Sequence, residues 1–204
     1  MTRLKVATPV GEAAVDLDLA PGARTLLVIG HGAGGSVEAP DLQAVRNACL
    51  AAGISVARVT QPYRLAGKKA PPTAATLDTA WRAVIASLGR RKATAGLRLV
   101  YAGPSSGARV ACRAACEQAI KPRPVAIVAL AFPLHPPGNS AKSRLAELAA
   151  VQLPVLVVQG LGDPFGMPEA GPGRTVEKVA GDHSLKGSAG RVGELVAGWI
   201  SALA

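Results

Sequence analysis

The sequence predicts an α/β fold: an open, mostly parallel β-sheet with helices on both faces. Apolar runs alternate along the chain with segments of helical periodicity. The runs are almost continuously apolar, which is typical of strands buried on both faces of a parallel sheet. The segments between them are long enough for crossover helices. A chain of 204 residues fits one domain, so we expect a single domain over residues 1–204.

Eight strands are predicted. Five are buried runs rich in Val, Leu and Ile, at residues 25–29, 54–60, 97–102, 125–130 and 155–159. Residues 4–7 and 13–19 form a preceding hairpin or edge pair, because the second segment alternates apolar and acidic residues. A weaker pattern places a last strand near residues 175–179.

Five helices are predicted between or after these strands, at residues 41–52, 73–88, 107–120, 143–150 and 189–203. Asp41 can cap the first helix, and Gly53 suits the left-handed position that follows it. Gly89 is predicted to end the second helix, and the third stops before Lys121-Pro122.

The chain is strongly basic, with a formal net charge of +10. The positive residues are scattered, and only 3% of all residues are aromatic, so no stacking side chains interleave with them. Because no nucleic-acid-binding motif is present either, we expect a solvated basic surface and no nucleic-acid partner.

Three cysteines imply no disulfide framework, and we expect all three to be small buried side chains. The N-terminal residues lack the apolar segment of a signal peptide, and the longest apolar run, residues 125–132, is too short to span a bilayer. We therefore expect a soluble cytoplasmic protein with no membrane partner, as a monomer or a homodimer.

The strongest local motif is Gly103-Pro104-Ser105-Ser106-Gly107, which fits G-x-S-x-G. It follows a predicted strand and opens a predicted helix, the context in which a serine nucleophile is exposed on a sharp turn. An ordinary Gly/Ser turn is the alternative interpretation. Of the two serines, Ser105 is the candidate nucleophile, because the glycines are centred on it.

Two later loops supply partners for a serine nucleophile. Asp163 comes just after the strand at 155–159, and His183 lies between the last predicted strand and the C-terminal helix. All three residues thus follow the carboxyl ends of strands, in the order Ser, Asp, His. This order predicts a triad in which His183 takes the Ser105 proton and Asp163 orients the imidazole.

A glycine-rich segment, Gly30-His31-Gly32-Ala33-Gly34-Gly35, follows the first buried strand. Small residues let the backbone approach a substrate, so we assign the oxyanion-hole N–H groups to Ala33 and Ser106. His31 and Gly32 are candidate substrate contacts. The segment fits neither phosphate-binding glycine pattern, so no nucleotide cofactor is predicted. No cluster has metal-ligand spacing, so no metal is predicted.

With these residues in place, the chain resembles the α/β-hydrolase superfamily over essentially its whole length. More narrowly, it resembles a small lidless branch akin to dienelactone hydrolases, which includes a testis-expressed hydrolase-like protein and a nuclear NSL-complex subunit. Six blocks carry this resemblance: His31-Gly-Ala-Gly34, Pro62-Tyr-Arg64 with Pro71-Pro72, Ser105 with Arg109, Phe132-Pro-Leu-His-Pro-Pro137, Gly162-Asp-Pro-Phe165 and Gly181-Asp-His-Ser184. The branch usually has Gly-x-Ser-Met-Gly-Gly-Arg, whereas here Ser106 replaces Met and Ala108 replaces Gly.

The resemblance implies an α/β-hydrolase fold without a cap domain. It also implies a serine hydrolase that cleaves a small ester or thioester through an acyl-enzyme. Arg64, Arg109 and His135 are candidate substrate-binding residues, although Arg109 and His135 also fit structural roles. A catalytically silent interaction module is one alternative, and an amide or C–C hydrolase using the same triad is another.

Overall fold

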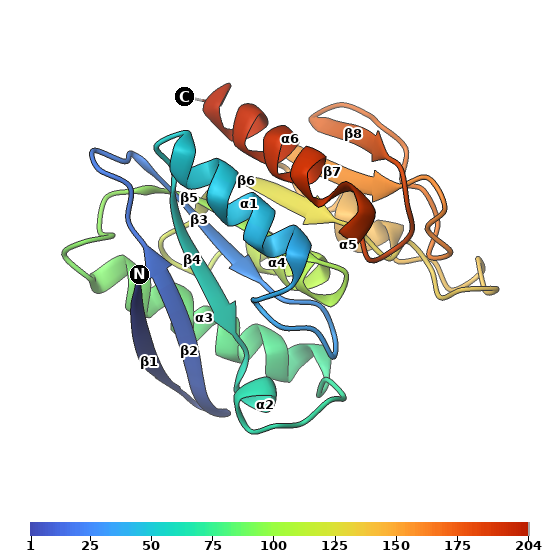
Figure 1. Cartoon of the computed structure of the whole chain (residues 1–204). Coiled ribbons are helices and arrows are strands. Elements are labelled where there is room, and N and C mark those ends of the chain that lie inside the picture. Colours follow the sequence, from blue (N-terminus) through green and yellow to red (C-terminus); the bar gives the residue numbers. More distant parts are fainter. Residues whose placement is uncertain (204) are drawn as a thin grey trace.

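The computed structural model describes residues 1–203, so the last residue of the expected domain lies outside the described part. Within it, eight strands form one sheet in the order β1-β2-β4-β3-β5-β6-β7-β8 (Figure 1). The strands are β1 (Thr2–Thr8), β2 (Gly11–Asp18), β3 (Thr25–Gly30), β4 (Ser55–Thr60), β5 (Arg98–Pro104), β6 (Pro124–Leu130), β7 (Val155–Gly160) and β8 (Arg174–Val179). β1 and β2 pair antiparallel, as do β2 and β4, and the remaining pairs are parallel.

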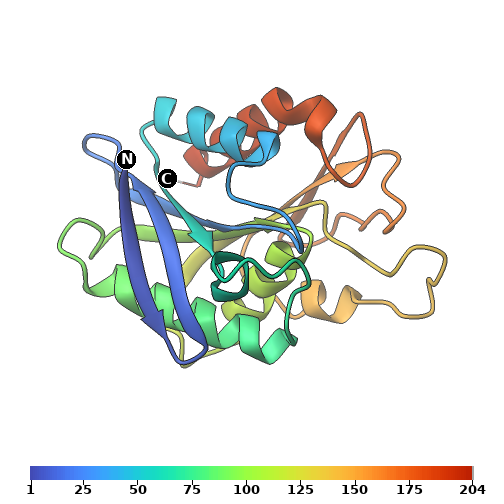
Figure 2. The ribbon, with the colours of Figure 1, turned by 60° about the horizontal axis from the view of Figure 1, so that its bottom comes forward.

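Helices cover both faces of the sheet (Figure 2). α1 (Pro40–Ala51) and α6 (Ala189–Ser201) lie side by side on one face, where they close one apolar cluster. α3 (Ala74–Arg90) and α4 (Ser106–Cys116) close a second cluster on the other face. Short helical segments occur in the connections: α2 (Pro62–Leu65), α5 (Leu145–Ala149) and a 3₁₀ turn, η1 (Lys186–Ser188).

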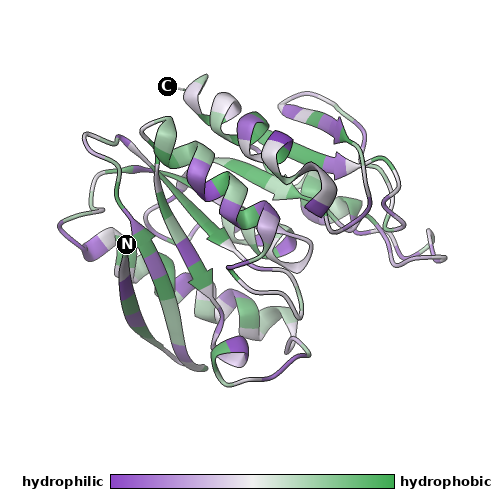
Figure 3. Ribbon diagram, in the orientation of Figure 1, coloured by the Kyte–Doolittle hydropathy of each residue, from purple (hydrophilic) through white to green (hydrophobic). Residues whose placement is uncertain are grey.

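The fold class is therefore confirmed, without a cap domain. The central strands are hydrophobic along nearly their whole length, as expected between two helical layers (Figure 3). Every predicted strand is present, including the weak last one, β8. No helix within residues 1–203 combines the length and apolar character needed to cross a bilayer.

Several predicted helix ends were wrong. Asp41 does not cap α1: the N-cap residue is Ala39, and Asp41 is buried in the first turn, where desolvation raises the pKa of its carboxyl. α3 continues through Gly89, and α4 ends at Cys116 rather than at residue 120. The latter end leaves Cys116 exposed, which corrects the expectation that all three cysteines are buried.

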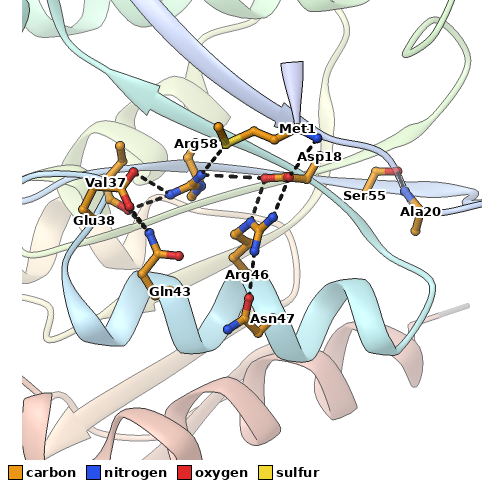
Figure 4. Close-up of polar contacts among 10 residues, drawn as sticks. All are labelled: Met1, Asp18, Ala20, Val37, Glu38, Gln43, Arg46, Asn47, Ser55 and Arg58. Carbon is orange, nitrogen blue, oxygen red and sulfur yellow. Dashed lines mark hydrogen bonds and ion pairs between the residues drawn. The ribbon is translucent and has the colours of Figure 1, made fainter. Parts of the chain in front are cut away.

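An ion network centred on the buried Asp18 and Arg58 ties the N-terminal part of the sheet to α1 and to the loop after β3 (Figure 4). The Asp18 carboxylate on β2 accepts hydrogen bonds of 2.8 and 2.7 Å from the Arg46 guanidinium, which is the main reason why the pKa of Asp18 is lowered. Arg58 on β4 is buried and donates to the Val37 carbonyl and to the Glu38 carboxylate, at 3.2 and 2.9 Å. The bonds of Arg58 anchor the chain just after the glycine-rich segment.

The α1–α6 contact depends on the absence of a side chain at Gly193. A Cβ there would lie 2.7 Å from the Ala44 carbonyl oxygen of α1. We therefore expect Gly193→Ala to force the helices apart and to lower the free energy of unfolding by about 1–3 kcal/mol. Urea denaturation followed by circular dichroism measures this change.

Gly198 on the same helix is the matched control, because it is exposed and nothing lies within 4 Å of a Cβ built there. In a helix interior, alanine is favoured over glycine by roughly 0.8–1 kcal/mol. Gly198→Ala is therefore expected to stabilise the protein. Stabilisation by Gly193→Ala as well would contradict close packing of α1 on α6.

Candidate active site

Ser105 sits on the sharp turn between β5 and α4, with φ 51° and ψ −112°. A positive φ is uncommon for a residue with a side chain and is found where the surrounding structure enforces it. Here the Ser105 N–H donates to the Leu130 carbonyl at 2.9 Å. The turn also brings Gly103 against Gly107, because a Cβ on Gly103 would lie 2.6 Å from the Gly107 carbonyl carbon. Gly103 is therefore required by the close approach of the strand and the helix. Gly107 is required by the approach of the helix to the glycine-rich loop, because a Cβ on Gly107 would lie 2.8 Å from the His31 carbonyl oxygen.

Three side chains from separate loops form a hydrogen-bonded chain at the carboxyl edge of the sheet. His183 Nε2 lies 2.9 Å from Ser105 Oγ, and His183 Nδ1 lies 2.8 Å from Asp163 Oδ2. The Asp163 side chain is 1% exposed and that of His183 is 23% exposed. The structure thus brings together the three residues that the sequence predicts as a triad.

The partners of His183 define its tautomer. A carboxylate only accepts hydrogen bonds, so the ring hydrogen lies on Nδ1 and points to Asp163. Nε2 is then free to accept the Ser105 hydroxyl hydrogen. This is the arrangement in which an imidazole can act as a general base toward a serine.

Two neighbours hold the Asp163 carboxylate, and the sequence analysis identified neither. The Phe165 N–H donates to Asp163 Oδ1 at 2.8 Å, and the Gln159 side-chain amide donates to Oδ2 at 2.8 Å. The Phe165 ring also stacks on the His183 imidazole, with centroids 4.1 Å apart. Gln159 could have been noticed in the sequence, because it is a polar residue near the end of the otherwise apolar strand β7.

Asp182 precedes His183 in the sequence, but it faces elsewhere. One Asp182 oxygen accepts hydrogen bonds from the Ser184 hydroxyl and N–H, at 2.7 and 2.9 Å. These bonds, the hydroxyl first, lower the pKa of Asp182. The carboxylate bonded to His183 Nδ1 is that of Asp163.

The glycine-rich loop passes beside Ser105. A Cβ on Gly32 would lie 3.7 Å from the Ser105 Cβ, and the adjacent residue Ala33 is exposed. Ser106 is the first residue of α4, so its N–H has no acceptor within the helix. Both residues assigned to the oxyanion hole therefore lie next to Ser105 or to a residue that touches it.

Comparison with known proteins identifies the family of the chain. Residues 23–190 match the sequence profile of the family described as "Alpha/beta hydrolase domain". The chain belongs to the α/β-hydrolase family. A comparison with curated protein sequences finds no match.

Solved structures similar to this α/β-hydrolase include a dienelactone hydrolase from Anabaena variabilis, with a TM-score of 0.79 and 18% identity over 98% of this chain and 96% of that one. An α/β serine hydrolase homologue from Coxiella burnetii has a TM-score of 0.77 and 18% identity over 98% and 97%. An α/β serine hydrolase without a lid from Xanthomonas campestris has a TM-score of 0.70 and 24% identity over 97% and 94%. At these identities the likeness shows the shared fold.

In this α/β-hydrolase, the buried His31 side chain supports the glycine-rich loop through hydrogen bonds. Its Nδ1 bonds the Gly32 carbonyl at 2.8 Å, and its Nε2 accepts the Gln61 N–H at 3.1 Å. Desolvation lowers the pKa of this buried imidazole, which favours the neutral ring. Since both ring nitrogens are bonded within the protein, neither faces a ligand.

Arg64 supports the same loop from α2. Its guanidinium donates to the Gly35 carbonyl at 2.9 Å and to the Lys68 carbonyl at 3.0 Å. α2 is therefore a support for the backbone that carries Ala33.

Arg109 pairs with an acid rather than pointing free into the site. It makes two hydrogen bonds to Glu147 on α5, of 2.8 and 2.7 Å, and Arg113 lies 3.4 Å from the same carboxylate. Burial of Glu147 opposes ionisation, but the two arginines outweigh it and lower the pKa of the carboxyl. Arg109 thus ties α5 to α4 beside the turn that carries Ser105.

His135 lies against the acid loop. Its backbone N–H donates to the Phe165 carbonyl at 3.0 Å, and its Nδ1 is 3.0 Å from the Pro136 carbonyl. A Cβ on Gly166 would lie 2.6 Å from His135 Nε2, so the ring packs directly on that glycine. His135 is half-buried and is connected to the triad through Phe165, whose carbonyl accepts the His135 N–H and whose ring stacks on His183.

One cavity lies away from the triad. It has a volume of about 550 Å³ between the β1–β2 turn, α2 and the start of α3, and none of Ser105, Asp163 and His183 lines it.

Over residues 1–203, no group of three or more His, Cys, Asp or Glu side chains is arranged to hold a metal ion. Desolvation raises the pKa of the buried Cys49 and Cys112 thiols to about 12, so both stay protonated at neutral pH.

Proposed function

We propose that this α/β-hydrolase cleaves small carboxylic esters or thioesters with Ser105 as the nucleophile. The observation that carries the proposal is the continuous hydrogen-bonded chain from Ser105 Oγ through His183 to Asp163, built on a turn with a positive φ at the serine. A serine hydroxyl is a weak nucleophile until an adjacent base accepts its proton. His183 is in position to do so.

In the acylation step, Ser105 Oγ attacks the carbonyl carbon of the substrate while its proton passes to His183 Nε2. The carbonyl oxygen becomes an oxyanion that accepts hydrogen bonds from the Ser106 and Ala33 N–H groups. The start of α4 behind Ser106 adds the favourable end of a helix dipole. His183 then gives its proton to the leaving alcohol or thiol as the ester bond breaks, which leaves an acyl group on Ser105.

Deacylation repeats these steps with water as the nucleophile. His183 Nε2 takes a proton from water, the hydroxide adds to the acyl carbon, and Ser105 Oγ leaves and takes the proton back. Asp163 stabilises the imidazolium that forms in each half-reaction. Because Asp163 is nearly fully buried, its charge acts on His183 with little screening by solvent.

The short connection between β6 and β7 limits the acyl group. Between Ala131 and Pro154 it holds one helix, α5, which is fastened to α4 by the Arg109–Glu147 pair. Such a segment builds no cap over the nucleophile, so a long alkyl chain stays in water. Each CH₂ left in water forgoes about 0.8 kcal/mol of binding. We therefore expect a preference for short or compact acyl groups, measurable as kcat/KM for p-nitrophenyl esters from acetate to palmitate.

The expected profile is highest for short acyl chains and flat or falling beyond butanoate. A kcat/KM that rises steadily past octanoate would indicate a long apolar channel and would refute the open, shallow site. Esters are compared below their critical micelle concentrations, so that aggregation of the substrate does not imitate a falling profile.

We also propose that the partners are small molecules rather than nucleic acids. Several arginines form ion pairs within the protein: Arg46 pairs with Asp18, Arg58 with Glu38, and Arg113 with Asp78. Their charges are therefore partly neutralised by acids of the same chain. Any nucleic-acid binding by the remaining scattered charges would be weak, steeply salt-dependent and indifferent to sequence.

A further inference from the structure

Gln159 is a buried polar residue whose position is not explained by packing. It is the last residue but one of β7, after Val155-Leu-Val-Val158, and the whole residue has no solvent exposure. Its side-chain Oε1 is buried without a hydrogen-bond partner within residues 1–203. A buried polar atom left unpaired costs stability. An apolar side chain of similar size would avoid that cost. We therefore expect the hydrogen bonds of the amide nitrogen to explain why a glutamine occupies this position.

The amide nitrogen of Gln159 has three acceptors around it. It lies 2.8 Å from Asp163 Oδ2, 2.8 Å from the Gly166 carbonyl oxygen and 3.2 Å from the Phe132 carbonyl oxygen. All three belong to loops at the carboxyl edge of the sheet. The amide has two hydrogens, so the two short bonds engage them fully, and the longer one is shared.

These bonds fix the orientation of the carboxylate that faces His183. Asp163 Oδ1 is held by the Phe165 N–H, and Oδ2 is held by Gln159 on one side and His183 Nδ1 on the other. Rotation of the carboxyl group would break all three hydrogen bonds. The bond to the Gly166 carbonyl holds the end of the same loop in place.

Building on the proposed function, we infer that Gln159 is a positioning residue that holds Asp163 in the orientation required for catalysis. It acts through Asp163, and being fully buried it does not touch the substrate. Its loss should therefore lower kcat and leave KM nearly unchanged. Loss of the hydrogen bond from Gln159 to the charged Asp163 carboxylate is expected to lower kcat by about 10-fold to 100-fold.

Gln159→Met tests this inference, because methionine has a similar length and no donor. Gln159→Asn is the second variant: it keeps an amide but is shorter by one CH₂, so its nitrogen withdraws from Asp163. Ser55→Ala is the matched structural control. It removes a buried hydrogen bond to the Ala20 N–H, distant from the triad, and should lower the melting temperature without lowering kcat.

A double-mutant cycle with Asp163→Ala separates positioning from general destabilisation. The rate of fluorophosphonate labelling of Ser105 is measured alongside kcat, so that slow variants remain measurable. If Gln159 acts through Asp163, then Gln159→Met lowers kcat and the labelling rate when Asp163 is present. The same substitution has almost no further effect on either quantity in the Asp163→Ala background. Effects that multiply in full would overturn the inference, as would an unchanged kcat in either folded Gln159 variant.

The outcomes also distinguish this inference from the proposed function. Absence of both ester turnover and labelling in the unaltered protein would refute the proposed function itself. Normal activity of the unaltered protein together with full activity of folded Gln159→Met or Gln159→Asn would refute the role of Gln159 alone.

Discussion

Replacing Ser105 by alanine is expected to lower ester turnover by roughly 10⁶-fold, as loss of the serine does in a well-measured triad enzyme. The variant keeps the turn and both proposed oxyanion donors, but it has no atom that can form the acyl-enzyme. Initial rates with p-nitrophenyl acetate measure the effect, and circular dichroism establishes that the variant is folded.

Ser106→Ala is the control for that experiment, because alanine removes the neighbouring hydroxyl and keeps the backbone N–H. This variant should retain most of the turnover. The opposite pattern, with turnover retained in Ser105→Ala and lost in Ser106→Ala, would place the nucleophile one residue later.

Asp163→Asn should lower kcat by about 10⁴-fold, the loss seen for the equivalent change in the best-studied triad. An amide no longer requires the His183 hydrogen on Nδ1, so the imidazole can adopt the tautomer that cannot accept from Ser105. The substitution is nearly isosteric, so the fold is expected to persist. Steady-state kinetics give kcat, and thermal denaturation checks stability.

Asp182→Asn is the matched control, since it makes the same chemical change in the residue beside His183. The Asp182 carboxylate bonds Ser184 at the surface, so kcat is expected to stay within a few-fold of the native value. Near-normal kcat in Asp163→Asn combined with a large loss in Asp182→Asn would mean that the acid had been misassigned.

The strands could be predicted because burial on both faces leaves an unmistakable apolar run. β3, β5, β6 and β7 are buried nearly throughout, and their predicted and observed bounds differ by two residues at most. The parallel arrangement followed from the helical segments between them. The short α2 was missed, because four residues are too few to show a helical period.

Helix ends depended on tertiary contacts that local pattern does not contain. Gly89 looked like a helix stop, yet α3 continues through it, and Pro122 packs where a side chain on Gly89 would lie. The glycine is there for that close approach. α4 ends at Cys116, and the chain then turns at Glu117 to Ile120. The proline at position 122 indicated only that the helix must end before it.

The candidate site was predictable to the extent that each of its residues follows the carboxyl end of a strand. Ser105, Asp163 and His183 meet for that reason, and the order in the chain identified them. Gln159 and Glu147 were not identified, because their importance lies in partners far along the chain or in another layer. Arg109 was recognised as having two interpretations, and only the structure supplies Glu147 as its partner.

The most direct test of Ser105 as the nucleophile is peptide mapping by mass spectrometry after reaction with a fluorophosphonate. The native protein should gain one phosphonyl group, and the modified peptide should carry it on Ser105. Labelling should also disappear in Ser105→Ala and slow strongly in His183→Ala, because His183 must accept the hydroxyl proton. An unmodified native protein would favour a catalytically silent fold, and full labelling of Ser105→Ala would contradict Ser105 as the nucleophile.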